Sequence, residues 1–296
     1  MAGKTKLLSV KLDLVFKLIF GDQRNTDILA SFLKSVLDIP EEEYEHITVV
    51  DPYIKADYPG DKYGILDIKI HTKSGRVIHT EIQVAPIPEM DQRSLFYQSK
   101  MVTEQLGSGE KYSLLKKVVS IIITDYALTQ LSGSDRYHHQ FRYRTGDGVE
   151  LTDLAEINTL ELAKLPREAD KTDLWNWMRF IGTNDEEELK MLATKSPELK
   201  KAVGVLMELS ADERTRMIAE DHEKARRDEA SRLDGAREEG RKEGRKEGRE
   251  EGRKEGREEG HQKTNLEHAR KMKGLGISVE NICAITGLPA ETVKKL

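Results

Sequence analysis

The sequence of 296 residues has a single cysteine, Cys283. One cysteine cannot form an intrachain disulfide, and no cluster of thiolates can hold a metal ion. Proteins without disulfides are typical of reducing compartments, so we expect a cytoplasmic location.

Long apolar runs are also missing. No stretch approaches the roughly 20 apolar residues that a membrane-spanning helix needs. The first apolar segment, 12–20, is interrupted by Asp13 and Lys17, which argues against a signal segment. We therefore expect no membrane partner.

Apolar residues are scarce, at 37% of the chain, while charged residues make up 34%. The shortage is local, because residues 7–180 contain enough leucine, isoleucine, valine and aromatic residues to bury a core.

Excess positive charge is absent as well, since the formal net charge is -5. This argues against a protein that binds DNA over its whole surface. It does not exclude a nuclease, because a metal ion in a cleft can neutralise phosphate locally.

The spacing of apolar residues predicts a mixed α/β fold, because helical and strand periodicities alternate along the first half of the chain. An almost unbroken apolar run at 118–123 is typical of a strand buried on both faces. The expected elements are helices at 12–20 and 28–37, β-rich runs at 46–54, 64–72 and 76–84, a helix at 88–106, the strand at 118–123, and short strands around a turn at 146–148 within 137–165.

Changes in composition predict four segments. An α/β domain at 1–165 is followed by a helical lobe at 166–234, in which Trp175 and Trp177 are expected to pack. A repeat of Gly, Arg, Lys and Glu occupies 235–263, and a small helical tail occupies 264–296. The tail resembles one half of a helix-turn-helix, but a small packing or dimerisation module explains its short helices equally well.

The repeat places a glycine, each preceded by Glu, at every fourth position from Gly240 to Gly260. Each glycine costs a helix about 1 kcal/mol relative to alanine, and the period sets like charges at i, i+4. Two interpretations remain open. The segment is a disordered spacer, or helices from several chains pack along the glycines and form a homo-oligomer.

One predicted hairpin carries the chemically interesting side chains. A three-residue loop at 73–75, with Gly75 in the left-handed conformation, is a common hairpin closure. This loop sets a register in which Asp67 faces Glu81 and Lys69 faces His79. Strand alternation then separates two faces. The apolar face has Leu66, Ile68, Ile70, Ile78, Ile82 and Val84, and the polar face has Asp67, Lys69, His71, His79, Glu81 and Gln83.

Two acids that face each other destabilise a sheet by about 0.2–1 kcal/mol, so their closeness suggests a cation between them. Two carboxylates, a backbone carbonyl and waters suit Mg²⁺ or Mn²⁺ better than zinc. Such an ion can lower the pKa of a bound water and stabilise charge on a phosphate. The alternative is an ordinary solvent-facing strand pair in which Lys69 relieves the repulsion without a metal.

The combination resembles the PD-(D/E)XK nuclease superfamily, and within it a bacterial family of recombination-promoting nucleases and transposases. The resemblance covers roughly residues 8–180. It rests on the order of the expected elements, which is α, β, β, β, α, β. Asp67 lies early in the second strand, and residues 81–83 lie on the third. Further matches are residues 13–21 in the first helix and Arg93, Tyr97 and Gln105 in the helix after the hairpin.

The resemblance implies a restriction-endonuclease-like mixed sheet flanked by helices, and a metal-dependent endonuclease that acts on DNA in recombination, transposition-like processes or phage defence. It implies that Asp67 and Glu81 bind the metal together with the carbonyl of Ile82. Gln83 stands where the superfamily has lysine, and an amide can orient water but cannot supply positive charge. Our hypothesis is that Lys69 supplies that charge.

Further residues of the same region have two interpretations each. Arg93, Tyr97 and Lys100 fall on one face of a helix and are compatible with phosphate contacts, although Tyr97 is equally compatible with a core position. Asp13 and Lys17 form an i, i+4 pair to which we assign no catalytic role. The competing function is a nuclease fold with weakened chemistry that acts as a DNA-binding or oligomerising partner.

Overall fold

The computed structural model describes residues 7–50, 53–54, 64–65, 67–87 and 89–296. The chain divides into two compact units, Met1–Glu223 and Lys224–Leu296. Each unit has its own apolar cluster, and each is considered by itself.

The first unit is built on a mixed six-stranded sheet, as the sequence predicts. Its strands lie in the order β1-β4-β5-β6-β8-β7. Strands β5, β6 and β8 run parallel, while β1, β4 and β7 pair antiparallel with their neighbours. The strands are β1 (Thr48–Val50), β4 (Ile68–His71), β5 (Val77–Gln83), β6 (Val118–Thr124), β7 (His138–Arg144) and β8 (Glu150–Glu161), with β2 (Tyr53–Ile54) and β3 (Gly64–Ile65) in a separate pair.

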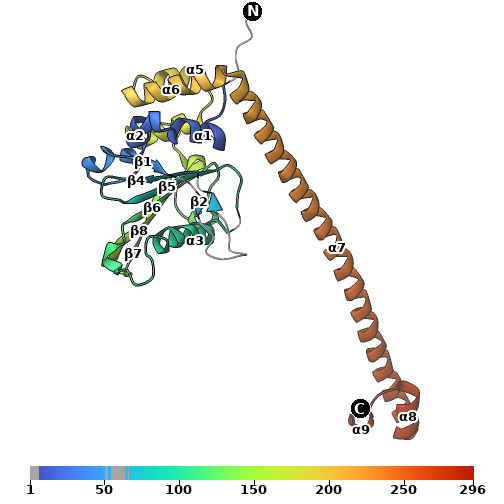
Figure 1. The fold of residues 1–296 in the computed structure, drawn as a ribbon. Helices are drawn as coiled ribbons and strands as arrows, with labels where there is room; N and C mark the ends of the chain where they lie inside the picture. The colour runs from blue at the N-terminus through green and yellow to red at the C-terminus, as the bar shows by residue number, and fades with distance from the viewer. Residues whose placement is uncertain (1–6, 51–52, 55–63, 66, 88) are drawn as a thin grey trace, which may run out of the picture. The chain divides into compact units, whose positions relative to one another are not determined.

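Helices cover both faces of the sheet (Figure 1), with α1, α2 and α6 on one face and α3 on the other. The α-helices of this unit are α1 (Asp13–Phe20), α2 (Thr26–Val36), α3 (Met90–Thr103), α4 (Asp173–Gly182), α5 (Glu186–Leu192) and α6 (Pro197–Ala211). Short 3-10 helices lie at η1 (Gln23–Asn25), η2 (Glu41–Tyr44), η3 (Tyr112–Leu114), η4 (Thr129–Leu131) and η5 (Leu162–Lys164).

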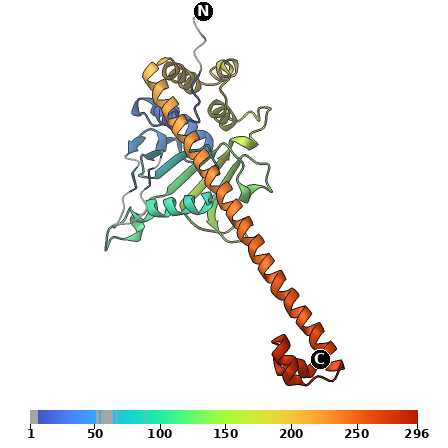
Figure 2. The ribbon, with the colours of Figure 1, turned by 90° about the vertical axis from the view of Figure 1, so that its right-hand side faces the viewer.

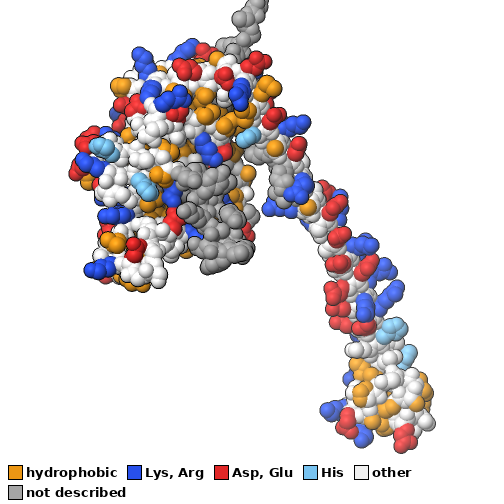
Figure 3. Space-filling model, viewed as in Figure 1, with side chains coloured by type: hydrophobic (Ala, Val, Ile, Leu, Met, Phe, Trp, Pro, Cys, Tyr) orange, Lys and Arg blue, Asp and Glu red, His pale blue; other side chains and the backbone are white. Residues whose placement is uncertain are grey.

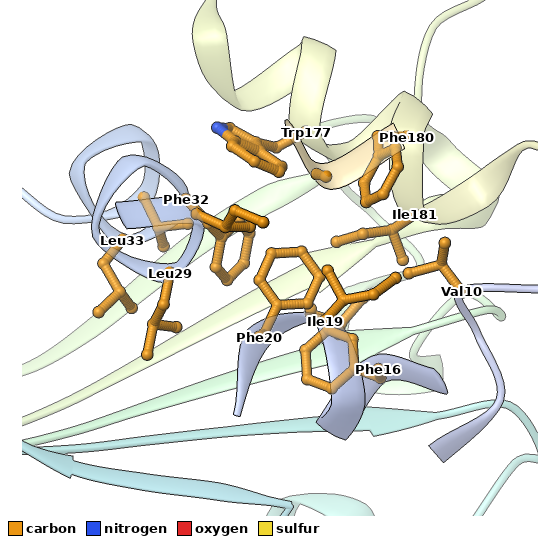
Figure 4. Close-up of a cluster of buried hydrophobic side chains, with 14 of the residues drawn as sticks. Val10, Phe16, Ile19, Phe20, Leu29, Phe32, Leu33, Trp177, Phe180 and Ile181 are labelled. Atoms are coloured by element: carbon orange, nitrogen blue, oxygen red, sulfur yellow. The ribbon is translucent and has the colours of Figure 1, made fainter. Parts of the chain in front are cut away.

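The main core lies between the sheet and the helices of α1, α2, α4 and α6. Its centre is a group of aromatic rings (Figure 4): Phe20 lies 4.8 Å from Phe16 and 5.8 Å from Trp177, measured between ring centroids. Trp177 is therefore a core residue, as expected. Because the helices after residue 172 share this core with α1 and α2, the segment expected as a helical lobe does not form a body of its own up to Glu223.

Local capping explains where the later helices begin. The side chains of Thr172, Asp185 and Ser196 accept hydrogen bonds from the first-turn backbone N–H groups of α4, α5 and α6. Pro197 occupies the first turn of α6, where its missing N–H costs nothing. These signals fix the helices that close the core.

The hairpin of β4 and β5 has the predicted register. Lys69 pairs with His79, and Gly75 has a φ of +85° in the connecting turn. The strand boundaries differ from expectation, however. The run 64–72 is divided between β3 and β4, and Leu66 lies outside the described residues.

Two other predicted segments require correction. The expected short strands within 137–165 are one seven-residue strand, β7, and one twelve-residue strand, β8, which is inserted between β6 and β7. The helix expected at 88–106 begins at Met90 and ends at Thr103, while Pro88 lies outside the described residues. In both cases the ends of the strands and of the helix depend on pairing and packing with distant parts of the chain. The local spacing of apolar residues does not reveal these ends.

The second unit is helical. Helix α7 (Glu213–Gly274) begins in the first unit and continues through the whole repeat, and charged side chains of both signs follow it (Figures 2 and 3). Helices α8 (Val279–Thr286) and α9 (Ala290–Lys295) pack on its end through Ala269, Ile282 and Val293. Among the described helices none is long and apolar enough to cross a membrane.

Candidate functional site

The face of the sheet beneath α3 carries buried polar side chains. Lys69, His79 and Glu81 are only 8%, 3% and 4% exposed. Helix α3 covers them, because its residues Tyr97 and Met101 pack against the same face of β5 and β6. The polar face of the hairpin is therefore not an ordinary solvent-facing surface, and the energetic cost of these groups needs an explanation.

Asp67 lies directly before β4, at the end of the hairpin. The ladder of β4 and β5 begins with the pair Ile68 and Thr80, so the predicted pairing of Asp67 with Glu81 lies one residue beyond it and stays a prediction. The Oδ2 atom of Asp67 accepts a hydrogen bond of 2.8 Å from the backbone N–H of Ile82. The Asp67 carboxylate is thus held at the residue that follows Glu81.

Helix α1 contributes two further side chains to this place. Lys17 Nζ lies 3.3 Å from Asp67 Oδ1 and 2.9 Å from Asp13 Oδ1, and Asp13 also shares a side-chain hydrogen bond with Asp67. Sequence reasoning assigned no role to Asp13 or Lys17. Their i, i+4 spacing is the only local signal, and it does not reveal that the fold brings them to the hairpin.

Burial raises the pKa of Asp67 to about 7, and the hydrogen bond and charge of Asp13 act in the same direction. The Ile82 N–H and the charge of Lys17 oppose the rise. Burial also raises the pKa of Glu81, against the charge of Arg93 and a hydrogen bond with Gln83. The positive charge around both acids is therefore too small to offset the cost of burying them in ionised form. A bound cation would supply that charge.

The other predicted residues lie around these acids in different ways. The Lys69 ammonium forms an ion pair with Glu104, at the end of α3. The Arg93 guanidinium stacks 4.6 Å from the ring centre of Tyr97, and its Nη1 lies 3.3 Å from the Tyr97 hydroxyl. Tyr97 is buried in the small cluster beneath α3, whereas Lys100 is half-buried on the same helix.

The donor set fits a hard divalent cation, since Asp67 and Glu81 offer carboxylate oxygens, and Asp67 is bound to the backbone N–H of Ile82, the residue next to Glu81. Within the described part of the chain, no group of three or more His, Cys, Asp or Glu side chains is arranged to hold a metal. An ion at this site would depend on two carboxylates, completed by a backbone carbonyl and water.

A comparison with protein families identifies the family of the first unit. The family model described as PD-(D/E)XK nuclease family transposase matches residues 10–236. This range includes the six-stranded sheet, the helices α1 to α6 and the residues of the candidate site. No curated protein and no solved structure matches the chain.

The raised pKa of Asp67 predicts a substitution that stabilises the metal-free protein. Between the ordinary pKa of 3.8 and about 7 the folded state retains a proton that the unfolded state releases, so rising pH reduces stability through this group. We expect Asp67→Asn in EDTA to raise the free energy of unfolding at pH 8 by on the order of 2 kcal/mol, with the difference vanishing near pH 4. Chemical denaturation at both pH values measures it.

Asp170→Asn is the matched control. Hydrogen bonds from Thr172 and Tyr137 lower the pKa of Asp170, so the same substitution should destabilise the protein at pH 8. An Asp67→Asn protein that is also less stable than the wild type at pH 8 would contradict the account of the site.

Proposed function

Because the chain belongs to the PD-(D/E)XK nuclease family transposases, we propose that it is a metal-dependent DNA endonuclease that hydrolyses phosphodiester bonds. The observation that supports this is the pair of insufficiently neutralised carboxylates, Asp67 beside Ile82 N–H and Glu81 beneath α3. A fold selected for stability alone would not retain both.

In this proposal Asp67 and Glu81 bind Mg²⁺ or Mn²⁺ together with the carbonyl of Ile82. The ion would supply Lewis acidity and a more acidic bound water. Gln83, which hydrogen-bonds Glu81, keeps that carboxylate oriented and offers its amide to the attacking water. These roles need oxygen ligands, which Asp67, Glu81 and the Ile82 carbonyl supply, and a neutral amide, which Gln83 supplies.

Two lysines are candidates for the positive charge that Gln83 cannot supply. Lys69 lies on the strand next to Glu81, although Glu104 neutralises part of its charge. Lys17 lies 3.3 Å from Asp67 Oδ1. We propose Lys69 as the residue that stabilises the transition state, with Lys17 as the second candidate.

Substrate phosphates are proposed to contact α3. Arg93 lies close enough for its charge to oppose the rise that burial causes in the pKa of Glu81, and Lys100 stands two turns further along the same helix. The buried Tyr97 holds the Arg93 guanidinium under its hydroxyl and ring. Its contribution to DNA binding is therefore to position Arg93.

The proposed setting is recombination, a transposition-like process or phage defence in the cytoplasm. The alternative is a weakened nuclease fold that binds DNA or oligomerises without cutting, which the Gln83 position favours because it lacks the superfamily lysine.

Plasmid cleavage separates the two functions. The wild-type protein should nick supercoiled DNA with Mg²⁺ or Mn²⁺ and not in EDTA. Asp67→Ala should reduce the rate by at least about a hundredfold, because it removes a metal ligand. Glu150→Gln, which changes an exposed acid on β8, should leave the rate unchanged. Wild-type protein that binds DNA but never nicks it would favour the alternative.

Lys69→Ala tests the proposed cation. Its cleavage rate should fall about 10- to 100-fold with Mn²⁺ affinity retained, since the charge acts on the transition state. Lys17→Met is measured beside it. Full activity of Lys69→Ala would refute its role, and a loss confined to Lys17→Met would transfer the role to Lys17.

We also propose that the repeat of α7 pairs nuclease units into a homo-oligomer, in which two active sites can cut the two strands of a duplex. A Cβ added at any of the repeat glycines from Gly240 to Gly260 would meet no atom of the described chain within 4 Å, apart from its neighbours in sequence and the backbone of its own helix turn. Packing within one chain therefore does not require these glycines, and close approach of another helix would explain their regular spacing.

Light scattering tests the oligomer. The wild-type mass should exceed that of one chain, and replacing Gly244, Gly248 and Gly252 by alanine should lower it. The same change should raise helix content, because each substitution favours the helix by about 1 kcal/mol. A monomeric wild-type mass at all concentrations would contradict the proposal.

A further inference from the structure

A polar layer separates two apolar clusters beneath α3. On one side Val77, Met101 and their neighbours form a small cluster, and on the other Met90 and Ile122 form a second. Between Val77 and Glu81 on β5 stands His79, and between Val118 and Ile122 on β6 stands Ser120. These two residues are direct partners in the parallel ladder.

The polar atoms of this layer have no hydrogen-bond partners among the residues that the structure describes. They are both ring nitrogens of His79 and the hydroxyl of Ser120, and each residue is at most 3% exposed. The Nε atom of Arg93 is buried without a partner as well. A buried donor or acceptor left without a partner costs about 1–3 kcal/mol. Apolar residues at 79 and 120 would join the flanking clusters without this cost.

The Glu81 carboxylate lies beside this layer and can accept a hydrogen bond from His79. His79 Nε2 lies 3.8 Å from Glu81 Oε2, slightly beyond hydrogen-bond reach. Catalytic hydrogen bonds are often long in ligand-free proteins and shorten in the complex. A neutral imidazole has one N–H donor and one acceptor nitrogen, so it can donate to Glu81 and accept from the Ser120 hydroxyl on the next strand.

We propose that His79 is a positioning residue for Glu81, and that a Ser120–His79–Glu81 chain of hydrogen bonds forms when the metal site is filled. Ser120 Oγ–H donates to Nδ1, which fixes the tautomer, and Nε2–H donates to Glu81 Oε2. The hydrogen bond holds the carboxylate in one orientation toward the ion. This inference rests on the proposed function, since it concerns Glu81 as a metal ligand.

The proposal is tested by two properties of one variant, the stability of the metal-free protein and its affinity for Mn²⁺, which should change in opposite directions. His79→Leu removes two unpaired buried atoms at similar side-chain volume, so the metal-free protein should be at least as stable as the wild type. Its Kd for Mn²⁺ should nevertheless rise about 10- to 100-fold, as is typical when a partner that orients a metal ligand is lost. Titration calorimetry with Mn²⁺ and denaturation in EDTA, both on the full chain, give the two values.

Three further variants complete the experiment. His79→Gln keeps an N–H at similar reach and should retain most of the affinity. Ser120→Ala should weaken Mn²⁺ binding less than His79→Leu does, and it serves if that variant fails to fold. His71→Leu, at an exposed histidine of β4, should leave the Kd unchanged.

The outcomes distinguish this inference from the proposed function. Wild-type protein that binds Mn²⁺ with the same Kd as His79→Leu and Ser120→Ala overturns the role of His79 and leaves the nuclease intact. Wild-type protein that binds no Mn²⁺ overturns both. Equal loss of affinity in His79→Leu and His79→Gln would also overturn the inference, because the hydrogen bond would then not be what matters.

Discussion

The register between β4 and β5 decides where the polar groups of the candidate site lie. The turn at Gly75 pairs Lys69 with His79, and this alternation directs Glu81 toward α3. A slip of one residue would turn these side chains into the aromatic core on the other face. The apolar face therefore fixes the register, and it also contributes the burial energy that offsets the cost of placing acids and a histidine beneath a helix.

Much of the fold and of the hairpin could be predicted from local patterns. The two opening helices, the buried strand β6 and the glycine turn follow from spacing and turn chemistry. The mixed α/β class and the family followed from the order of these elements and from the acids of the hairpin, and the match over 10–236 confirms them. Adjacency along a hairpin is short-range information, so the sequence pattern alone is enough to select Asp67 and Glu81 as candidate site residues.

Contacts between distant elements could not be predicted in the same way. The approach of Lys17 to Asp67 joins the first helix to the hairpin, and the ion pair of Lys69 with Glu104 depends on where α3 ends. The polar face of the hairpin is buried because α3 lies over it. Strand alternation shows which side chains share a face, but it does not show what covers that face. The repeat gave no decisive signal either, since its glycines disfavour a helix that the structure nevertheless contains.

All of the proposed chemistry requires one divalent cation to bind between Asp67 and Glu81. Anomalous diffraction from crystals grown with Mn²⁺ tests it most directly. We expect an anomalous peak within direct coordination distance, about 2.2 Å, of a carboxylate oxygen of both Asp67 and Glu81. A well-diffracting crystal with Mn²⁺ bound elsewhere, or with the two carboxylates turned to opposite sides of the sheet, would contradict it.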